Sequence, residues 1–499
     1  MKNLTLFILF TLHLSLFTLH LSSQPCLPEG ITFTTQAEID NFQTNYPNCT
    51  EIEGDVAIYG DDITNLDGLS NVITIGGTLQ IGNNINMSGA NPVLISLEGL
   101  GNLCAVGGDL EILGNDILVD LSGLESLTSI GGSLVIGDWW NTWPCANLSL
   151  LSLDGLNNLS SVGDHIQIFG GIVEDISALF NLTSINGNVY MRYVPSLQSL
   201  DGLNNISSIG GHLTLFGLGM TNLSDLDNLS YIGSDFVLNN NDSLISLSGL
   251  ATLDSIGGTL HISSNSILEN LSGLENLTFI GGSLEVLFND TLTSLTGLDN
   301  IDLASIDNLE IRNNKLLSNC EVQSICDYLV SPNGTITIYG NAPGCNSPGE
   351  IANACGFPMP CLPFGNYYIT SQAEVDSFQS YYPGCTDLTG DVTIVGYLPG
   401  NTPINNLNGL DIISSVEGSL TIQYNDSLTS LAGLDSLISI GGDLWIRENV
   451  ALTGLAGLDF LTSIGGNLLI QENVALTNVT GLDSVTSIGG HFLLVTTMS

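Results

Sequence analysis

A phrase of about 24 residues recurs along almost the whole chain, and this repeat constrains the fold more than any other feature. A regular copy, LTSIGGNLLIQENVALTNVTGLDS, covers residues 461–484. Its apolar residues alternate within short runs, which is the spacing of strands rather than of helices. Gly-Gly and Asn separate the runs, where tight turns need a positive φ or a side chain that bonds the backbone. We therefore predict a solenoid in which each phrase forms one turn of about three short strands.

One such turn cannot bury its own Leu and Ile residues. Turns that stack at roughly 4.8 Å form parallel sheets around one continuous core. The recurring Asn supports this stacking, because inward-facing Asn side chains can bond one another and the turn backbone in every coil. These residues are Asn84, Asn115, Asn241, Asn265, Asn289, Asn314, Asn425, Asn449 and Asn473. The predicted Asn ladder fails in four consecutive coils, at Trp139, Gly171, Val194 and Leu218.

The charge of the chain limits its partners. Fifty acidic and five basic residues give a formal charge of −45. Nucleic-acid binding uses clustered Lys and Arg to neutralise phosphates, so a nucleic-acid partner is excluded. An anionic membrane surface repels such a chain for the same reason. We expect an extracellular glycan or a protein as the partner.

The first 24 residues have one Lys, then an apolar run, then small polar residues. This order predicts a secretory signal peptide at 1–24, with a membrane anchor as the alternative. No later segment has 18 uninterrupted apolar residues, so we expect no membrane insertion after cleavage. The mature chain is thus predicted to be secreted or displayed at the cell surface.

Ten cysteines in an exported chain predict disulfides. Two pairs, Cys26 with Cys49 and Cys361 with Cys385, flank segments that begin with a capping box, Thr35 to Glu38 and Ser371 to Glu374. Each segment predicts a short helix that covers an open end of the core, held by a bridge worth about 3 kcal/mol. Four further cysteines allow three connectivities, among which we favour Cys320–Cys345 with Cys326–Cys355. The pairing of Cys104 and Cys145 stays open.

These caps divide the chain. Residues 25–355 are predicted to form a complete capped solenoid domain, 356–360 a linker, and 361–499 a second solenoid domain. The second domain has no C-terminal cap in the sequence. Because an uncapped sheet end invites edge-to-edge association, we expect the chain to be a fragment or to lack an anchoring tail.

The coils and the cysteine placement resemble the receptor L-domain family, a relative of leucine-rich repeats. The resemblance rests on Cys26 and Cys49, on the segments I-x-G-D-V-x-I at 52–58 and L-x-G-D-V-x-I at 388–394, and on the L-x-S-I-G-G-x-L-x-I coils. It implies an all-β fold, a right-handed parallel β-solenoid of the single-stranded β-helix type with short capping helices. The nearest members are repeat-rich secreted bacterial surface proteins, and many members have no known ligand.

Functional sites in a repeat protein are sought where the repeat is broken. The insertion GDWWNTWPCANLSL at 137–150 adjoins the ladder gap and holds three of the four Trp residues. The next coils carry Phe169, Arg192 and Phe216 at one equivalent position, which predicts a column at roughly 4.8 Å spacing. Aromatic and Arg side chains suit sugar rings or a protein partner, and the alternative is an aromatic ladder that only covers the core. The predicted ligand-binding residues are Trp139, Trp140, Trp143, Phe169, Tyr190, Arg192 and Phe216.

Four acidic residues occupy the same position after Gly-Leu in successive coils: Asp411, Asp435, Asp459 and Asp483. Like charges one coil apart repel, so Ca²⁺ could bind between them. The dense Gly-Gly-x-Gly-x-Asp repeats of calcium β-rolls are absent, which favours a solvated acidic face instead. No other cofactor is expected.

The sequence argues against catalysis. Some β-helices cleave acidic polysaccharides with Asp, Lys and Arg on one face, but here Lys315 and three arginines lie in separate regions. Arg312 and Lys315 are expected to pair with Asp307 or Glu310. His165 and His212 are two coils apart, too far for one metal ion without a bridging ligand. No HExxH, GxSxG or phosphate-binding loop occurs. We therefore predict a non-catalytic recognition or adhesion module, with a structural cell-envelope spacer and then a polysaccharide-active enzyme as alternatives.

Overall fold

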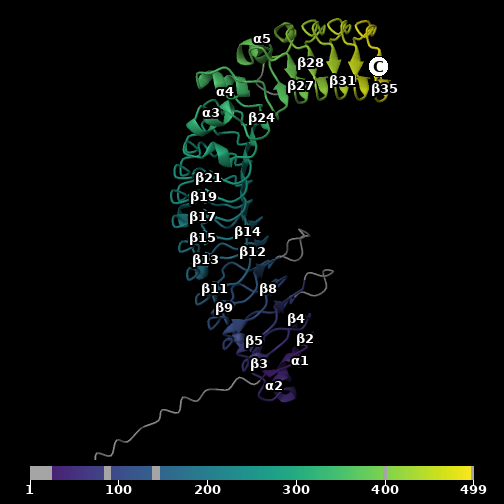
Figure 1. Ribbon diagram of the computed structural model, residues 1–499. Helices are drawn as coiled ribbons and strands as arrows, with labels where there is room; N and C mark the ends of the chain where they lie inside the picture. The colour runs from purple at the N-terminus through teal and green to yellow at the C-terminus, as the bar shows by residue number, and fades with distance from the viewer. Residues whose placement is uncertain (1–24, 84–90, 138–146, 397–401, 496–499) are drawn as a thin grey trace, which may run out of the picture.

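The computed structural model describes residues 25–83, 91–137, 147–396 and 402–495. Stacked coils form a curved rod that runs from the N-terminal helices to strand β35 (Phe492–Val495) (Figure 1). Neighbouring coils pair through parallel strands, so the described chain is a solenoid of parallel sheets with few helices. The predicted repeat solenoid is confirmed at this level.

A 13-stranded sheet, here called the long sheet, lines the inner side of the curve (Figure 1). Its strands have three or four residues, and their side chains alternate between the core and the surface. The strands are β2 (Ile31–Phe33), β4 (Val56–Ile58), β6 (Leu79–Ile81), β8 (Leu110–Ile112), β10 (Leu134–Ile136), β12 (Ile166–Phe169), β14 (Val189–Arg192), β16 (Leu213–Phe216), β18 (Phe236–Asn239), β20 (Leu260–Ser263), β22 (Leu284–Leu287), β23 (Leu309–Arg312) and β24 (Ile336–Tyr339). A second, six-stranded sheet continues the pattern with β25 (Tyr367–Ile369), β27 (Val392–Val395), β29 (Leu420–Gln423), β31 (Leu444–Arg447), β33 (Leu468–Gln471) and β35.

Two-residue strands form the short-strand sheets on another side of each coil. One has β1 (Pro25–Cys26), β3 (Glu51–Ile52), β5 (Thr74–Ile75), β7 (Ala105–Val106), β9 (Ser129–Ile130) and β11 (Ser161–Val162). The next has β13 (Ser184–Ile185), β15 (Ser208–Ile209), β17 (Tyr231–Ile232), β19 (Ser255–Ile256) and β21 (Phe279–Ile280). The last has β26 (Asp387–Leu388), β28 (Ser415–Val416), β30 (Ser439–Ile440), β32 (Ser463–Ile464) and β34 (Ser487–Ile488).

The prediction of about three strands per coil is wrong, because a typical described coil has two. Its third side consists of tight turns, some of them 3₁₀ turns such as η4 (Ser224–Leu226), with isolated bridges at Ser152–Asp175 and Ser294–Asn319. The Gly-Leu turn explains the difference. Gly273 has φ +117°, and a Cβ atom there would lie 2.3 Å from the carbonyl oxygen of Leu247 in the preceding coil. The chain bends at this glycine instead of extending into a strand.

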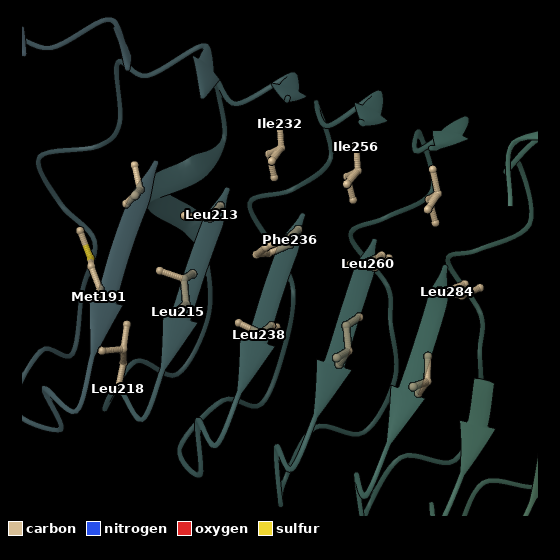
Figure 2. Close-up of a cluster of buried hydrophobic side chains, with 14 of the residues drawn as sticks. Met191, Leu213, Leu215, Leu218, Ile232, Phe236, Leu238, Ile256, Leu260 and Leu284 are labelled. Atoms are coloured by element: carbon tan, nitrogen blue, oxygen red, sulfur yellow. The ribbon is translucent and has the colours of Figure 1, made fainter. Parts of the chain in front are cut away.

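The core is one continuous column of aliphatic side chains. Figure 2 shows a stretch of it, in which Leu213, Phe236 and Leu260 from neighbouring strands follow one another and are fully buried. Burying each such side chain contributes roughly 1.5–3 kcal/mol. No coil could bury these residues alone, so stability comes from stacking.

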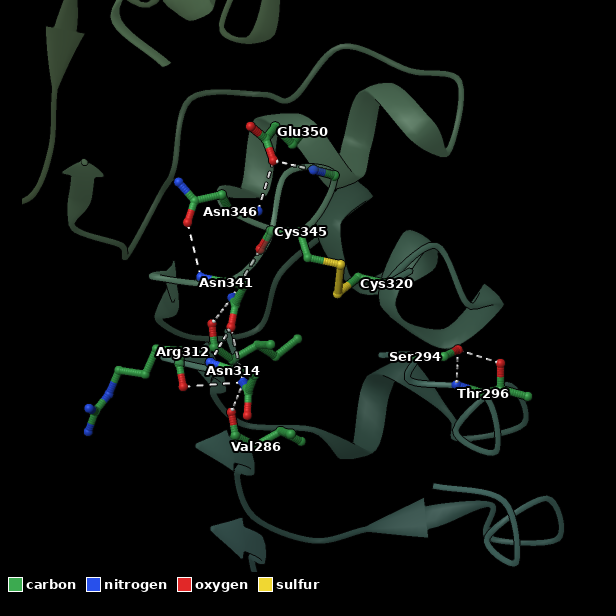
Figure 3. Close-up of a disulfide and its surroundings, with 12 residues drawn as sticks. Val286, Ser294, Thr296, Arg312, Asn314, Cys320, Asn341, Cys345, Asn346 and Glu350 are labelled. Carbon is green, nitrogen blue, oxygen red and sulfur yellow. Dashed lines mark hydrogen bonds between the residues drawn. A yellow bond between two sulfur atoms is a disulfide. The ribbon is translucent and has the colours of Figure 1, made fainter. Parts of the chain in front are cut away.

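The predicted Asn ladder exists, and its bonds satisfy the buried turns. The backbone N–H of Asn241 donates to Oδ1 of Asn265 at 3.1 Å, and Asn265 Nδ2 donates to the carbonyl of Leu238 at 3.0 Å and to Oδ1 of Asn289 at 3.2 Å. Figure 3 shows the same pattern from Asn314 to Asn341. An Asn inside the ladder, such as Asn265, therefore links three successive coils.

Two ladder positions differ from the prediction. Asn91 and Asn147 are the buried ladder members, and Asn91 Nδ2 donates to Oδ1 of Asn115 at 3.0 Å. The residues assigned from the sequence, Asn84 and Trp139, lie outside the described residues. The extra residues of these coils precede the ladder Asn in the chain, so counting forward from Gly-Gly selected the wrong residue. The gap therefore covers three coils, at Gly171, Val194 and Leu218.

Helices α1 (Gln36–Asp40) and α5 (Gln372–Tyr381) begin directly after the predicted capping residues Thr35 and Ser371. The other described α-helices are α2 (Phe42–Asn45), α3 (Gln323–Val330) and α4 (Pro348–Ala354), and α3 begins without a side-chain cap. Side chains of Thr35, Ser347 and Ser371 accept the backbone N–H three residues later, as capping residues do. The four predicted disulfides form: Cys26–Cys49, Cys320–Cys345 (Figure 3), Cys326–Cys355 and Cys361–Cys385. Cys104 is exposed and has no disulfide partner among the described residues, whereas Cys145 lies outside them.

The segment between β24 and β25 is packed against the core. Met359, inside the predicted linker, is buried, and its N–H donates to the carbonyl of Tyr381 at 2.9 Å. Asn346 accepts the backbone N–H of the ladder residue Asn341 at 3.0 Å, and its Nδ2 donates to Thr370 Oγ1 at 3.0 Å and to Glu374 Oε1 at 2.6 Å. Burial raises the pKa of Glu374 to about 8. The division into domains at 355 and 361 remains a prediction.

Candidate functional site

Three neighbouring strands of the long sheet bring the predicted column together. Phe169 pairs with Arg192 in the parallel register of β12 and β14, and Arg192 pairs with Phe216 in that of β14 and β16. Tyr190 lies two residues before Arg192 on the same face, because side chains alternate along a strand. The sequence therefore located these four residues correctly relative to one another.

The side chains of this column are unequally exposed. Phe169 is only 5% exposed, so it packs against the protein and offers no free ring face. Tyr190, Arg192 and Phe216 are half-buried. Tyr193 is 50% exposed, and its ring packs edge to face on Phe216 with centroids 4.7 Å apart. The accessible rings are thus those of Tyr190, Tyr193 and Phe216.

The guanidinium of Arg192 completes this group. Its Cζ lies 5.4 Å from the centroid of the Tyr190 ring, within the range of a cation–π contact. Desolvation raises the pKa of the Tyr190 hydroxyl, with Arg192 acting in the opposite direction, so the ring carries no charge near neutral pH. We call Tyr190, Arg192, Tyr193 and Phe216 the first Arg–aromatic cluster.

Two histidines flank Tyr190 rather than facing each other. The ring centroids of His165 and His212 lie 6.5 Å and 6.4 Å from that of Tyr190. His165 Nδ1 accepts the backbone N–H of Asn188 at 2.8 Å, and His212 lies 3.2 Å from a carboxylate oxygen of Asp235. These contacts hold the two histidine rings on either side of Tyr190.

The Trp part of the predicted site lies outside the described residues. This concerns Trp139, Trp140 and Trp143, so the structure neither adds them to the cluster nor removes them. Tyr193 has φ +58°, a left-handed conformation that the equivalent residues of other coils share, for example Gly170, Gly217 and Asn240. This conformation therefore belongs to the repeat and does not distinguish the cluster.

The other two arginines occupy the equivalent position of their coils, which the sequence reading missed. Arg312 is the last residue of β23 and Arg447 the last residue of β31, as Arg192 is of β14. Arg312 Cζ lies 5.0 Å from the Phe288 ring, and Arg447 Cζ lies 5.7 Å from the Trp445 ring. The signal was present, because each Arg directly follows the second consensus apolar residue of its coil.

The basic residues have the following acidic partners. Arg312 Nε donates to Glu310, one of the two acidic residues proposed from the sequence. Lys315 instead pairs with Asp290 at 2.7 Å, one coil away on the surface, so the expectation of Asp307 or Glu310 is wrong for Lys315.

Three of the four aligned aspartates accept hydrogen bonds from neighbouring groups. Carboxylates of Asp435 and Asp459 accept the backbone N–H of Gly433 and Gly457 at 2.9 and 3.1 Å, and Asp411 accepts Gln379 Nε2. Within the described ranges, no three His, Cys, Asp or Glu side chains are grouped so as to hold a metal ion. The calcium prediction for Asp411, Asp435, Asp459 and Asp483 gains no support from these contacts.

A shallow groove of about 530 Å³ runs along the last short-strand sheet. Ser, Gly and apolar residues of four coils line it, from Ser415 to Gly489, and Glu417 is the titratable residue among them. Such a lining offers hydroxyl groups and one carboxylate, without an aromatic ring or a cation. The first Arg–aromatic cluster is therefore the better candidate site.

No protein-family model matches the chain, and no curated protein matches its sequence. Among solved structures, an internalin from Listeria monocytogenes strain 4b F2365 aligns with 16% identity and a TM-score of 0.36, over 74% of this chain and 87% of the internalin. TLR13 in its complex with ssRNA aligns with 13% identity and a TM-score of 0.19, over 93% of this chain and 91% of the TLR13 chain. Scores this low carry no conclusion about this chain. In the part of the chain described, no helix has the length and apolar character to cross a membrane.

Proposed function

We propose that this chain is a secreted or cell-surface recognition module that binds a glycan through the first Arg–aromatic cluster. One observation carries the proposal. In a chain with five basic residues, Arg192 stands on a solvent-facing sheet surface among three accessible rings. Aromatic and Arg side chains dominate binding energies at recognition sites.

The chemistry of the cluster suits a sugar. A pyranose ring has an apolar C–H face and a rim of hydroxyl groups. The rings of Tyr193 and Phe216 can pack against the apolar face, while the planar guanidinium of Arg192 donates to the hydroxyl groups. A protein ligand is the second possibility that the same side chains allow.

Location and fold type belong to the same proposal. Four disulfides among the described residues fit a chain that folds in an oxidising compartment, and a signal peptide at 1–24 would take it there. We further propose that the solenoid is the right-handed, single-stranded β-helix of the receptor L-domain type. The cysteine-bridged helical cap before the first coil supports this assignment.

The test is an array screen of glycans and extracellular proteins with the full chain, beside a variant carrying R192Q and Y193A. Phe169 is left intact because it is buried. The matched control replaces exposed rings of the short-strand sheet, Tyr231→Ala and Phe279→Ala, which are 44% and 45% exposed. We expect a glycan signal that falls about tenfold or more in the variant and persists in the control. No glycan signal, or one indifferent to R192Q and Y193A, would favour the structural spacer.

A further inference from the structure

All three arginines of the sequence stand at one position of the coil, each among aromatic rings. The second Arg–aromatic cluster comprises Phe288, Arg312, Tyr339 and Tyr368. The third comprises Tyr424, Trp445 and Arg447. Rings lie within 6 Å of each guanidinium carbon: Tyr190 at 5.4 Å, Phe288 at 5.0 Å, and Tyr424 and Trp445 at 5.9 and 5.7 Å.

The second cluster crosses the boundary between the two sheets. Arg312 pairs in register with Tyr339 of β24, and the ring of Tyr339 lies 4.5 Å from that of Tyr368 in β25. Phe288 is 46% exposed beside Arg312. The surface is therefore continuous from the long sheet to the sheet that follows it.

The third cluster repeats the arrangement further along. Trp445 occupies the same register position as Tyr368, three strand steps away through Thr393 and Thr421. Arg447 Nε donates to Oε1 of Gln423 at 2.6 Å, which holds the guanidinium against the rings. At strand spacing the two rings are roughly 14 Å apart.

The clusters follow one another along the chain of strands, on β14 and β23 of the long sheet and on β31 of the sheet that follows it. Figure 1 shows these sheets on the inner side of the curved rod. Five strand steps separate Arg192 in β14 from Arg312 in β23, which is roughly 24 Å. Residues between them on the same face are unlike the clusters, for example Val237, His261 and Glu285. Similar chemistry thus recurs at intervals rather than forming one contiguous patch.

Building on the proposed function, we infer that the ligand is an extended neutral polysaccharide that contacts the three Arg–aromatic clusters in turn. A polymer presents the same sugar again and again, so it can meet the same side chains at several points. A globular protein partner would instead need about 800 Å² of contiguous surface. A polyanion is disfavoured by the formal charge of −45 and by Glu310 beside Arg312.

Such contacts are multivalent. When one cluster holds the polymer, the next binds it at a high effective concentration, and avidity can exceed the affinity of a single site by about 10²–10⁴. Short oligosaccharides reach one cluster and gain nothing from the others. Affinity should therefore rise steeply with chain length until the ligand spans from the first cluster to the third.

The experiment is affinity electrophoresis of the full chain in gels that contain a soluble β-1,3-glucan, a xylan or a mannan. Oligosaccharides of increasing length then compete for the polymer that retards the chain. Three variants test the clusters one by one: R192Q, R312Q and R447Q. Tyr231→Ala with Phe279→Ala is the control, and circular dichroism verifies that each variant is folded.

We expect each single Arg variant to weaken polymer binding by about tenfold or more. A variant that combines R192Q, R312Q and R447Q should bind long and short oligosaccharides with the same affinity. If R192Q abolishes binding while R312Q and R447Q bind as the wild type, the proposed function stands and this inference is wrong. Affinity that is independent of sugar length would also overturn it. If none of the polysaccharides retards the chain, the glycan proposal and this inference both fail.

Discussion

Replacing Glu374 by Gln should remove a pH dependence from the stability of the chain. Glu374 is buried, and its Oε1 accepts Asn346 Nδ2 at 2.6 Å while its Oε2 accepts the hydroxyl of Thr370 at 3.2 Å. Desolvation is the largest cause of its high pKa. It outweighs the hydrogen bonds from the backbone N–H and the hydroxyl of Thr370, and the nearby charge of Glu350 acts in the same direction. The folded chain therefore prefers the neutral carboxyl group.

The sign and size follow from linkage. A carboxyl group whose pKa rises from 4.5 to about 8 contributes stability that is fully present below pH 4.5 and is lost as the pH rises through about 8. The rise corresponds to about 5 kcal/mol at ~1.4 kcal/mol per pH unit. The neutral amide of E374Q does not titrate. The substitution should lower the stability by about 1–2 kcal/mol at pH 5. The NH₂ group of Gln replaces one of the two oxygens, and it cannot accept the hydrogen bond that this oxygen receives from Asn346 or from Thr370.

The assay is urea denaturation at several pH values between 5 and 9, with hydrogen exchange of residues 366–382 as a local readout. We expect the wild-type and E374Q curves of stability against pH to cross, with the wild type more stable at pH 5 and the variant more stable at pH 9. A wild-type midpoint that stays level or rises over this range would refute the reasoning. It would mean that the hydrogen bonds keep Glu374 ionised despite burial.

The chain contains its own control. Glu38 occupies the same capping-box position and accepts the N–H of Thr34 at 2.7 Å, but it is exposed, and this backbone hydrogen bond lowers its pKa. Its contribution is therefore present above pH 4.5 and is lost as the pH falls through the lowered pKa. E38Q should leave the slope between pH 5 and pH 9 unchanged.

Three further predictions concern the stability of the chain. Asn265→Ala should lower the free energy of unfolding by roughly 3 kcal/mol, because buried backbone groups of the neighbouring coils lose their hydrogen-bond partners. The control Asn276→Ala removes an exposed donor and should cost less than about 1 kcal/mol. Equal shifts of the two urea midpoints would contradict the role of the ladder. Replacing Cys320 and Cys345 by Ser removes a disulfide with a sequence separation of 25 and should cost about 3 kcal/mol of stability. We expect faster proteolysis of 318–355 in this variant. An unchanged rate would count against a stabilising role of the disulfide. Lys315→Ala should change stability by less than about 1 kcal/mol, because its ion pair with Asp290 is exposed, and a larger loss of the urea midpoint would show that the pair matters.

The sequence predicted the features that follow from a constant coil length, above all which residues of neighbouring coils stand in register. The column of Phe169, Arg192 and Phe216 followed from counting residues, because a constant coil length puts equal positions in register. The same counting failed for Asn91 and Asn147, since it cannot tell on which side of the Asn an insertion lies. The equivalence of Arg312 and Arg447 with Arg192 was also missed, although each of the three ends its strand of the coil.

Burial was harder to predict than register. Phe169 and Phe216 occupy one column, yet Phe169 is buried and Phe216 is half-buried. The exposure of each ring depends on which side chains of the surrounding chain cover it. Glu38 and Glu374 stand in nearly identical motifs, but the pKa of Glu38 is lowered and that of Glu374 is raised. The difference arises from Asn346 and the preceding coils, which cover Glu374 and are far from Glu38.

Because the register between coils is constant, the number of coils sets the distance between any two sites on the rod. Each coil contacts its two neighbours through the same strand pairs, so a repeat could be duplicated or deleted in the gene without repacking the others. Each such event between two clusters would change their separation by one increment of roughly 4.8 Å. Selection could thus match the distances between clusters to the period of a polymer by changing the number of coils, without inventing a new side chain.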